Sequence, residues 1–456
     1  MTLIFSASGL RGTIGGRPGE NLTPIDAVQW AAAWGYWHYQ RRGPVPLVIG
    51  QDARPSGIIL RPLVGQTLRA FGHTVLDVGL TTTPTLEMAI PHLQAQGGVI
   101  LTASHNPAGW NALKFLNEEG EFLAPEILQK IAALKEEVIF PAIETPGPMS
   151  FPENLLTHHI QRLLARPEVL AEKIARLSLR IVVDGINSGG AIAVPALLEA
   201  LGVRDIYLLN GEPNGHFAHP PEPLPENLTQ LAEAVRTHKA HLGIAVDPDV
   251  DRVAFFLPTG EPFGEEYTLV AVADYILSRQ KGPVVTNQST TLAVRKVAEK
   301  HGVPFYESRV GEYYVVQKMK AVGAVIGGEG NGGVIWPAVH YGRDALVGIA
   351  LFLSALAEAG GDALALRAQY PSFVMRKEKL PLATPLPSEV WPKLLEAAPE
   401  ATPSLEDGLK LSWPDKWIHL RASATEPLLR IIAEAPTTEE CETLIHAWKG
   451  YLQAYL

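Results

Sequence analysis

Short apolar runs alternate with longer amphipathic stretches along most of this chain, and this alternation is what most constrains its fold. The apolar runs are about five to eight residues long and the amphipathic stretches about twelve to eighteen, the usual lengths of buried strands and surface helices. Such alternation predicts βαβ units and an α/β fold with parallel or mixed sheets. The 456 residues exceed what a single hydrophobic core organises, so several domains are expected.

Local signals place the first elements of this fold. Thr23 followed by Pro24 predicts a helix start, with threonine as the capping residue and proline at the first helical position. The helix should run towards Arg42. Strands are expected at residues 46–51, 74–79 and 98–102.

A recurring pattern divides the chain into domains. A helix end, a glycine and a short strand follow one another at 68–79, 198–210 and 298–311, as expected of three α/β units with one construction. After a glycine-containing hinge at 357–365 the sequence becomes typical of a small α+β unit. We therefore expect three related α/β domains with mixed sheets and a smaller C-terminal α+β domain, at residues 1–147, 148–252, 253–362 and 363–456.

Charge and composition exclude several classes of protein. The net charge of −10 argues against a surface for nucleic acid or anionic membranes, because such binding depends on a basic field. No apolar run reaches the length of a membrane span, and the first residues lack a signal-peptide pattern, so a cytoplasmic protein is expected. The single cysteine, Cys441, cannot form an internal disulfide and is expected to be a packed helix residue.

The stretch 97–115 is an apolar strand followed by a loop rich in Ser, Asn, Pro and Gly. This order presents the hydroxyl of Ser104 at the C-terminal end of a strand, where α/β folds place their sites. His105 beside it could indicate a serine hydrolase, but neighbouring side chains on an extended segment diverge, and no G-x-S-x-G pattern is present. A loop that only satisfies its own backbone through Asx and Ser turns is the alternative.

A second loop carries Asp247, Asp249 and Asp251 directly after an apolar strand. Alternate positions of a strand point to one side, so these carboxylates should converge and repel one another unless a cation lies between them. Mg²⁺ is the expected cation, since the central glycine and terminal glutamate of an EF-hand are missing. A solvated acidic loop is the alternative.

A third loop, at 325–335, is rich in glycine and contains Glu329 and Asn331. The glycines allow a ligand to approach the backbone, and a carboxylate and an amide suit the hydroxyl groups of a sugar. An ordinary glycine-rich turn is equally compatible with this segment.

A fourth loop combines arginine, serine and threonine at 419–431. The guanidinium groups of Arg421 and Arg430, with the hydroxyl groups of Ser423 and Thr425, have the composition of a phosphate clamp. The alternating polar residues could instead form the exposed face of a strand.

Taken together and in this order, the four loops resemble those of the α-D-phosphohexomutase family, over nearly the whole chain. TASHNP at 102–107 is similar to the phosphoserine loop of that family, DPDVDR at 247–252 to its metal loop, and RASATEP at 421–427 to its phosphate-binding loop. The resemblance implies four domains around a central cleft, with a fourth domain that closes on the substrate phosphate.

The resemblance also implies a mechanism with named residues. A phosphoserine at position 104 would exchange its phosphoryl group with a hexose phosphate through a hexose 1,6-bisphosphate, which also serves as activator. One Mg²⁺ would be held by the three aspartates and Ser104. The implied catalytic residues are Ser104, Lys114, Arg11, His105 and His340, and the implied substrate-binding residues are Arg252, Arg309, Gly311, Glu329, Asn331, Arg343, Arg421, Ser423, Thr425 and Arg430.

One departure from the family pattern concerns the third loop. Many members have Gly-Glu-x-Ser-Gly-His there, whereas this chain has Asn331 and Gly333 at the serine and histidine positions. His340 and Arg343 lie close by in the sequence and could take over proton transfer or phosphate contact; a buried structural histidine is the alternative.

The expected activity is interconversion of hexose 1-phosphate and hexose 6-phosphate, with glucose or mannose phosphate as substrate and glucosamine phosphate as the alternative. A phosphatase with the same serine and metal, and a silent paralogue that only binds sugar phosphates, are the rival hypotheses. The expected partners are small sugar phosphates, with no nucleic acid and no membrane, and the chain should be a monomer or homodimer.

Overall fold

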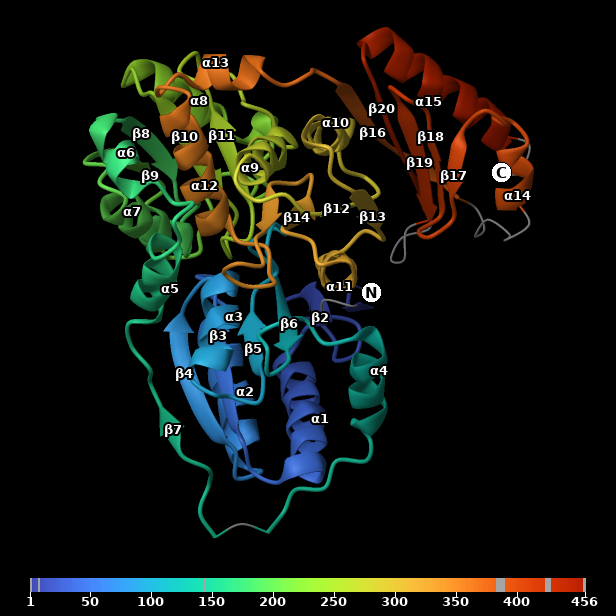
Figure 1. Cartoon of the computed structure of the whole chain (residues 1–456). Coiled ribbons are helices and arrows are strands. Elements are labelled where there is room, and N and C mark those ends of the chain that lie inside the picture. The colour runs from blue at the N-terminus through green and yellow to red at the C-terminus, as the bar shows by residue number, and fades with distance from the viewer. Residues whose placement is uncertain (1, 7–8, 143, 383–389, 423–427, 454–456) are drawn as a thin grey trace.

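The computed structural model describes residues 2–6, 9–142, 144–382, 390–422 and 428–453, which form four domains (Figure 1). The first domain lies at the bottom of the view, the second and third lie above it, and the fourth stands to one side of the third. Within these ranges, no helix combines the length and apolar character that a membrane span requires.

The first domain begins as its sequence predicts. Helix α1 (Pro24–Arg42) follows Thr23, whose hydroxyl accepts from the Asp26 amide while the Asp26 carboxylate accepts from the Thr23 amide. This reciprocal cap satisfies amides that a helix start leaves without partners. The three predicted strands are confirmed as β3 (Pro46–Gln51), β4 (Thr74–Leu80) and β5 (Gly98–Leu101).

The sheet of the first domain has seven strands, and helices cover both of its faces. Its order is β1 (Ile4–Ser6), β2 (Gly9–Thr13), β6 (Trp110–Leu116), β5, β3, β4 and β7 (Met149–Ser150). The other helices of this domain are α2 (Gly57–Arg69), α3 (Thr83–His92) and α4 (Pro125–Leu134).

The second and third sheets repeat the central part of the first. In each, the first strand has parallel neighbours on both sides, and a fourth strand runs antiparallel to the third. The second sheet contains β8 (Arg180–Asp184), β9 (Asp205–Leu209), β10 (Leu242–Val246) and β11 (Val253–Phe256); the third contains β12 (Val284–Asn287), β13 (Phe305–Ser308), β14 (Ile326–Glu329) and β15 (Gly333–Ile335). This shared order confirms three related α/β domains with mixed sheets.

Helices of the second and third domains pack around a continuous hydrophobic core. The rings of Phe255 on β11 and Phe352 on α12 stack with centroids 3.8 Å apart, so the two domains share this core. The helices that contribute to this core are α5 (Leu155–Leu164), α6 (Ala171–Arg176), α7 (Gly190–Ala200), α9 (Tyr267–Leu277), α10 (Leu292–His301), α12 (Ala345–Glu358) and α13 (Ala363–Ala368). Helices α8 (Thr229–Thr237) and α11 (Glu312–Val322) pack in two smaller hydrophobic clusters.

The fourth domain is the expected small α+β unit. Its antiparallel sheet has the order β16 (Val374–Pro381), β20 (Leu428–Ala435), β19 (Trp417–Ala422), β18 (Leu409–Ser412) and β17 (Thr402–Ser404), with helices α14 (Val390–Leu395) and α15 (Thr438–Gln453). Cys441 is buried on α15, and its thiol donates to the carbonyl of Ala433, which confirms a packed helix residue.

Strand pairing moves two of the expected domain boundaries. A boundary after residue 147 would separate β7 from β4, and one after residue 252 would separate β11 from β10, although both pairs are joined by backbone hydrogen bonds. A strand belongs to the sheet that satisfies its backbone groups. We therefore propose that the first domain extends through Ser150 and the second through Phe256.

Candidate active site

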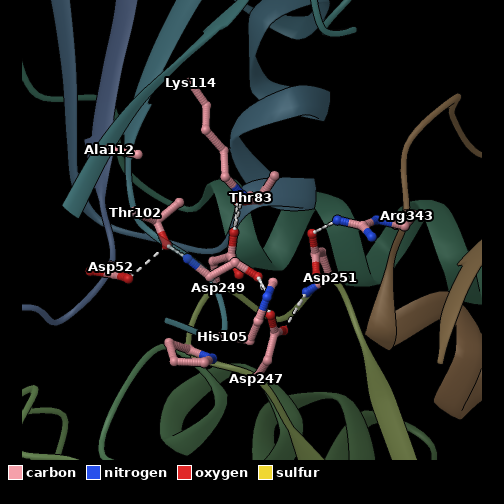
Figure 2. A network of polar contacts seen from close by, with 12 residues as sticks. Asp52, Thr83, Thr102, His105, Ala112, Lys114, Asp247, Asp249, Asp251 and Arg343 are labelled. Atoms are coloured by element: carbon pink, nitrogen blue, oxygen red, sulfur yellow. Dashed lines mark hydrogen bonds and ion pairs between the residues drawn. The ribbon is translucent and has the colours of Figure 1, made fainter. Parts of the chain in front are cut away.

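Three of the four loops occupy equivalent positions in their domains. The Ser104 loop joins β5 to β6, the aspartate loop joins β10 to β11, and the Glu329 loop joins β14 to β15. In the second and third domains the loop connects the third strand to the antiparallel fourth, and β5 and β6 occupy the same two places beside β3 in the first sheet. Side chains from these domains meet at one point. Ser104 contacts Asp247, and Asp251 contacts Arg343 (Figure 2).

Ser104 lies in a tight turn that points its hydroxyl at the aspartate loop. Its φ of 48° is in the left-handed region, its side chain is 2% exposed, and its Oγ donates to Asp247 Oδ2 at 2.6 Å. The same Oγ lies 3.3 Å from His105 Nδ1, so the expectation that these neighbouring side chains diverge was wrong. The segment is not extended there, because the left-handed turn at Ser104 brings the two side chains together.

Arg54 stabilises this turn through hydrogen bonds to its backbone carbonyls. Its buried guanidinium is paired with Asp52, Nε to Oδ2 at 3.0 Å, and Asp52 also accepts from the hydroxyl of Thr102 at 2.7 Å. The two terminal nitrogens donate to backbone carbonyls along the loop, those of Ser104, Asn106 and Pro107 at 2.6 Å and that of Trp110 at 2.9 Å. The position of Ser104 therefore depends on one planar guanidinium.

We expect Arg54→Lys to lower both stability and turnover, because a lysine keeps the charge but cannot serve four carbonyls and Asp52 together. Buried carbonyls left without donors should lower the melting temperature of the first domain by roughly 5–10 °C. Differential scanning calorimetry and a turnover assay would measure this. Arg69→Lys is the matched control, since Arg69 also donates to a carbonyl, that of Gly147, but lies away from the site. Equal behaviour of the two variants would contradict the role given to Arg54.

The three aspartates converge as expected, but for a different reason. Residues 247–252 form a turn rather than a strand, and Val250 within it has a φ of 62°. All three carboxylates are fully buried, with oxygen atoms within 4.8 Å of one another. A solvated acidic loop is therefore excluded, and the tight turn, rather than strand alternation, brings the side chains together.

The electrostatics of this cluster fit a cation. Burial, followed by the charges of Asp251 and Asp249, raises the pKa of Asp247 well above its ordinary value. Among the described residues, Oδ1 of Asp249 and Oδ1 of Asp251 have no hydrogen-bond partner. Buried carboxylate oxygens without partners are costly, and a divalent cation would supply what they lack.

Two cations of the protein already contact the cluster. Lys114 Nζ and the Thr83 hydroxyl each donate to Asp249 Oδ2 at 2.6 Å (Figure 2). Although burial alone would raise it, Lys114 holds the pKa of Asp249 below its ordinary value. Arg343 pairs with Asp251 Oδ2. All of these contacts are made to the Oδ2 atoms of Asp249 and Asp251. The Oδ1 atoms of both residues are left for a bound cation.

Arg343 links the aspartates to the glycine-rich loop. It donates from Nη1 to Glu329 Oε2 at 2.6 Å and from Nε to Glu312 Oε2 at 3.0 Å, besides its contact with Asp251. Although burial would raise it, Arg343 and Asn287 hold the pKa of Glu329 below its ordinary value, so this carboxylate is ionised. Its other oxygen accepts from the Gly311 amide at 3.0 Å.

A group of arginines makes the space beside Ser104 strongly positive. The charge of Arg252, followed by burial and the charge of Arg11, lowers the pKa of His105 far below its ordinary value, so this imidazole is neutral. Burial and Arg252 also lower the pKa of Arg11, whose Nη1 donates to Asn106 Oδ1 at 2.8 Å. Such a concentration of positive charge next to a buried hydroxyl suits a phosphoryl group.

Sequence comparison identifies the group of proteins to which this arrangement belongs. The patterns of phosphoglucomutase/phosphomannomutase α/β/α domains I, II and III match residues 2–141, 157–260 and 264–373, and the C-terminal domain matches 388–448. A probable phosphoglucosamine mutase of Methanopyrus kandleri is 34% identical over 97% of this chain and 96% of its own length. The chain belongs to the phosphoglucomutase/phosphomannomutase family.

Other proteins similar to this phosphohexomutase belong to the same family. The phosphoglucomutase/phosphomannomutase of Thermococcus kodakarensis is 32% identical over 96% of both chains. The crystal structure of a putative phosphomannomutase from Thermus thermophilus superposes with a TM-score of 0.82 at 26% identity, over 99% of both chains. The chain is thus an enzyme, an isomerase that transfers a phosphoryl group within its substrate.

His340 of the phosphohexomutase lies in a separate cluster at the junction of three domains. Its Nε2 lies 3.0 Å from Asp344 Oδ2, which also contacts Nε2 of His159 at 2.8 Å. The Glu87 carboxylate lies 3.6 Å from His340 Nδ1, and burial raises its pKa well above its ordinary value. Asp344 also caps α12, so these contacts fix the helix that follows Arg343.

The loops that would read the sugar and its distal phosphate come from the third and fourth domains of the phosphohexomutase. Asn331 accepts from the Gly333 amide at 3.2 Å, while Arg309 is exposed with its guanidinium over the Tyr314 ring. Arg421 pairs with Asp407 at 2.9 Å, and Arg430 is exposed. The predicted ligands Ser423 and Thr425 lie outside the described residues.

Sequence reasoning missed several residues of this site. Arg54 had a visible signal, since Asp52 and Arg54 follow an apolar strand within three residues, at the same kind of strand end as Ser104. Thr83 had none, because it meets Asp249 across 166 positions of the chain. Such partners become visible only when the domains are packed.

Proposed function

We propose that this enzyme interconverts hexose 1-phosphate and hexose 6-phosphate through a phosphoserine at position 104 and a hexose 1,6-bisphosphate. The observation that carries the proposal is the buried Ser104 hydroxyl, 2.6 Å from Asp247, between a three-carboxylate cluster and several arginines. A hydroxyl in this setting is stabilised as a phosphate ester, because anion-binding groups surround it.

Mg²⁺ would be held by Asp247, Asp249, Asp251 and the group on Ser104. The fit rests on the two orphaned carboxylate oxygens and on the raised pKa of Asp247. When bound, the ion supplies electrostatic withdrawal of charge from the phosphoryl oxygens.

The protein's own residues would perform the remaining steps. Arg11 and Arg252 neutralise charge on the phosphoryl group as the bond to Ser104 Oγ breaks and a bond to the sugar oxygen forms. Lys114 Nζ, held by Asp249 at 2.6 Å, gives a proton to Ser104 Oγ as that oxygen leaves and takes the proton of the attacking sugar hydroxyl, so its charge is the same before and after the step. His105 is neutral beside Ser104, so its ring nitrogen is a second acceptor that could take up the proton of the sugar hydroxyl.

The sugar would be held from the third domain and its second phosphate from the fourth. Glu329 accepts hydrogen bonds from the hydroxyls and the Asn331 amide donates to them, with Arg309 and the Gly311 loop beside them. Arg343 holds Glu329 and Asp251 in place, because its donors are taken by three carboxylates. The phosphate that is not reacting binds Arg421 and Arg430, with Ser423 and Thr425 as further donors. The contacts of His340 with Asp344 and Glu87 favour a structural role over proton transfer.

Three alternatives are separated by one set of assays. Because the relatives include a phosphoglucosamine mutase, glucosamine phosphate is the first alternative substrate. A phosphatase and a silent sugar-phosphate-binding protein are the others. The test is to assay glucose 1-phosphate, mannose 1-phosphate and glucosamine 1-phosphate side by side, with Mg²⁺ and a trace of the matching bisphosphate. Isomerisation well above release of inorganic phosphate is expected for at least one sugar, and no isomerisation of any sugar would refute the proposal.

A further inference from the structure

One face of the fourth-domain sheet looks towards the third domain, while the other packs on α15 (Figure 1). A cross-strand row on the first face contains Lys410 on β18, His419 on β19 and Lys377 on β16. Each is matched by a third-domain group: Glu307 lies 2.7 Å from Lys410, Ser289 lies 2.9 Å from His419, and Glu265 lies 3.6 Å from Lys377. The third domain thus neutralises this row.

A second row lies two residues further along the same strands and on the same face. Arg421 on β19 is opposite Arg430 on β20, which in turn is opposite Lys379 on β16. Directly opposite residues have Cβ atoms about 4.5–5.5 Å apart, and like charges in such positions destabilise a sheet. Three long cationic side chains therefore converge over β20 at a cost to the domain.

Little in the described part of the chain offsets this charge. Arg421 pairs with Asp407, but Arg430 and Lys379 are exposed and have no acidic partner among the described residues. In a protein whose net charge is −10, a row of three cations with one carboxylate is an unusual local excess. An anionic ligand would relieve the repulsion.

This row lies beside the loop that supports Glu329. Asp407 Oδ2 accepts from the Val310 amide at 3.0 Å while it pairs with Arg421, and the next amide along the chain, that of Gly311, donates to Glu329. A ligand held between Glu329 and the fourth domain would therefore have its distal end near the row.

We propose that Lys379 is a third cationic ligand of the phosphate that is not reacting, together with Arg421 and Arg430. This inference rests on the proposed function. A lysine on the far strand supplies a point charge without a fixed hydrogen-bond geometry, so it serves the phosphate equally well on O1 or O6 of the sugar.

The kinetic test compares Lys379→Met with Lys416→Met. Lys416 lies in the same domain, at the opposite end of β19, so the control removes the same charge away from the row. Lys379→Met should raise KM for every accepted sugar phosphate about fivefold to tenfold, as expected for the loss of one charged hydrogen bond, with kcat little changed. Lys379→Arg should restore KM, and Lys416→Met should stay within about twofold of the wild type. Equal effects of Lys379→Met and Lys416→Met would overturn the assignment.

A binding measurement separates this inference from the proposed function. Titration calorimetry on Ser104→Ala protein, with and without Lys379→Met, would use glucose 6-phosphate and glucosamine 6-phosphate, with glucose as the phosphate-free control. The Kd of the phosphates should rise about fivefold to tenfold and the response to glucose should not change. Equal Kd values, or no binding of either phosphate, would overturn the role of Lys379. If the wild-type enzyme isomerised none of the sugar phosphates, phosphate-dependent binding that Lys379→Met weakens would keep the role of Lys379 and refute the proposed function.

Discussion

Ser104→Ala protein should lose at least about 10⁴-fold in turnover while remaining folded, because in the proposed mechanism the variant removes the oxygen atom that carries the phosphoryl group between the two ends of the sugar. Alanine and serine both have a Cβ, so the left-handed φ of 48° costs the same in the variant as in the wild type. The turn held by Arg54 should therefore persist. A coupled assay would measure turnover. Intact mass and peptide mapping should find one phosphate on residue 104 of active wild-type enzyme and none in the variant.

Ser188→Ala is the matched control for this variant. Ser188 is also a fully buried serine next to the site, and its Oγ donates to the carbonyl of Pro248 in the aspartate loop at 2.7 Å. Losing that bond, together with the one that the same Oγ accepts from the Ala53 amide, should reduce turnover less than about tenfold, because the variant removes no group from the reaction itself. Turnover by Ser104→Ala within tenfold of the wild type would remove the phosphoserine from the mechanism.

Asp247→Asn should lower turnover by at least about 10²-fold without lowering the stability of the metal-free protein. The amide oxygen can still accept from the backbone of Asp251 and Arg252, and one negative charge leaves a buried cluster in which the carboxylates repel one another. In excess chelator the melting temperature should therefore be equal to that of the wild type or higher. The rise in melting temperature that Mg²⁺ produces in the wild type should be lost.

Asp184→Asn is expected to show the opposite pattern. Asp184 is a buried aspartate at the end of β8 in the same domain, but it pairs with His219 at 2.9 Å and lies outside the three-carboxylate cluster. Its loss should lower stability and leave the response to Mg²⁺ intact. Full activity in excess chelator, or a normal Mg²⁺ response in Asp247→Asn, would show that the aspartates do not serve a metal.

The sequence by itself determined the fold class, the repeated domains and the nature of each functional loop. Helix α1 and the strands β3, β4 and β5 were predicted because their signals are local: capping chemistry at Thr23, and apolar runs of strand length. The loops were recognised by the residue types that phosphate, metal and sugar require. These types are a property of the chemistry and are visible without coordinates.

Only the tertiary structure decided how these groups act on one another. The left-handed turns at Ser104 and Val250 set which side chains converge, and neither residue has a local preference for such a conformation. The domain boundary that we propose after β11 rests on the backbone pairing of β11 with β10. The contacts of Ser104 with Asp247, Lys114 with Asp249 and Arg343 with Asp251 join residues 143, 135 and 92 positions apart. Contacts of this kind depend on how whole domains pack, and no short-range pattern in a sequence encodes that packing.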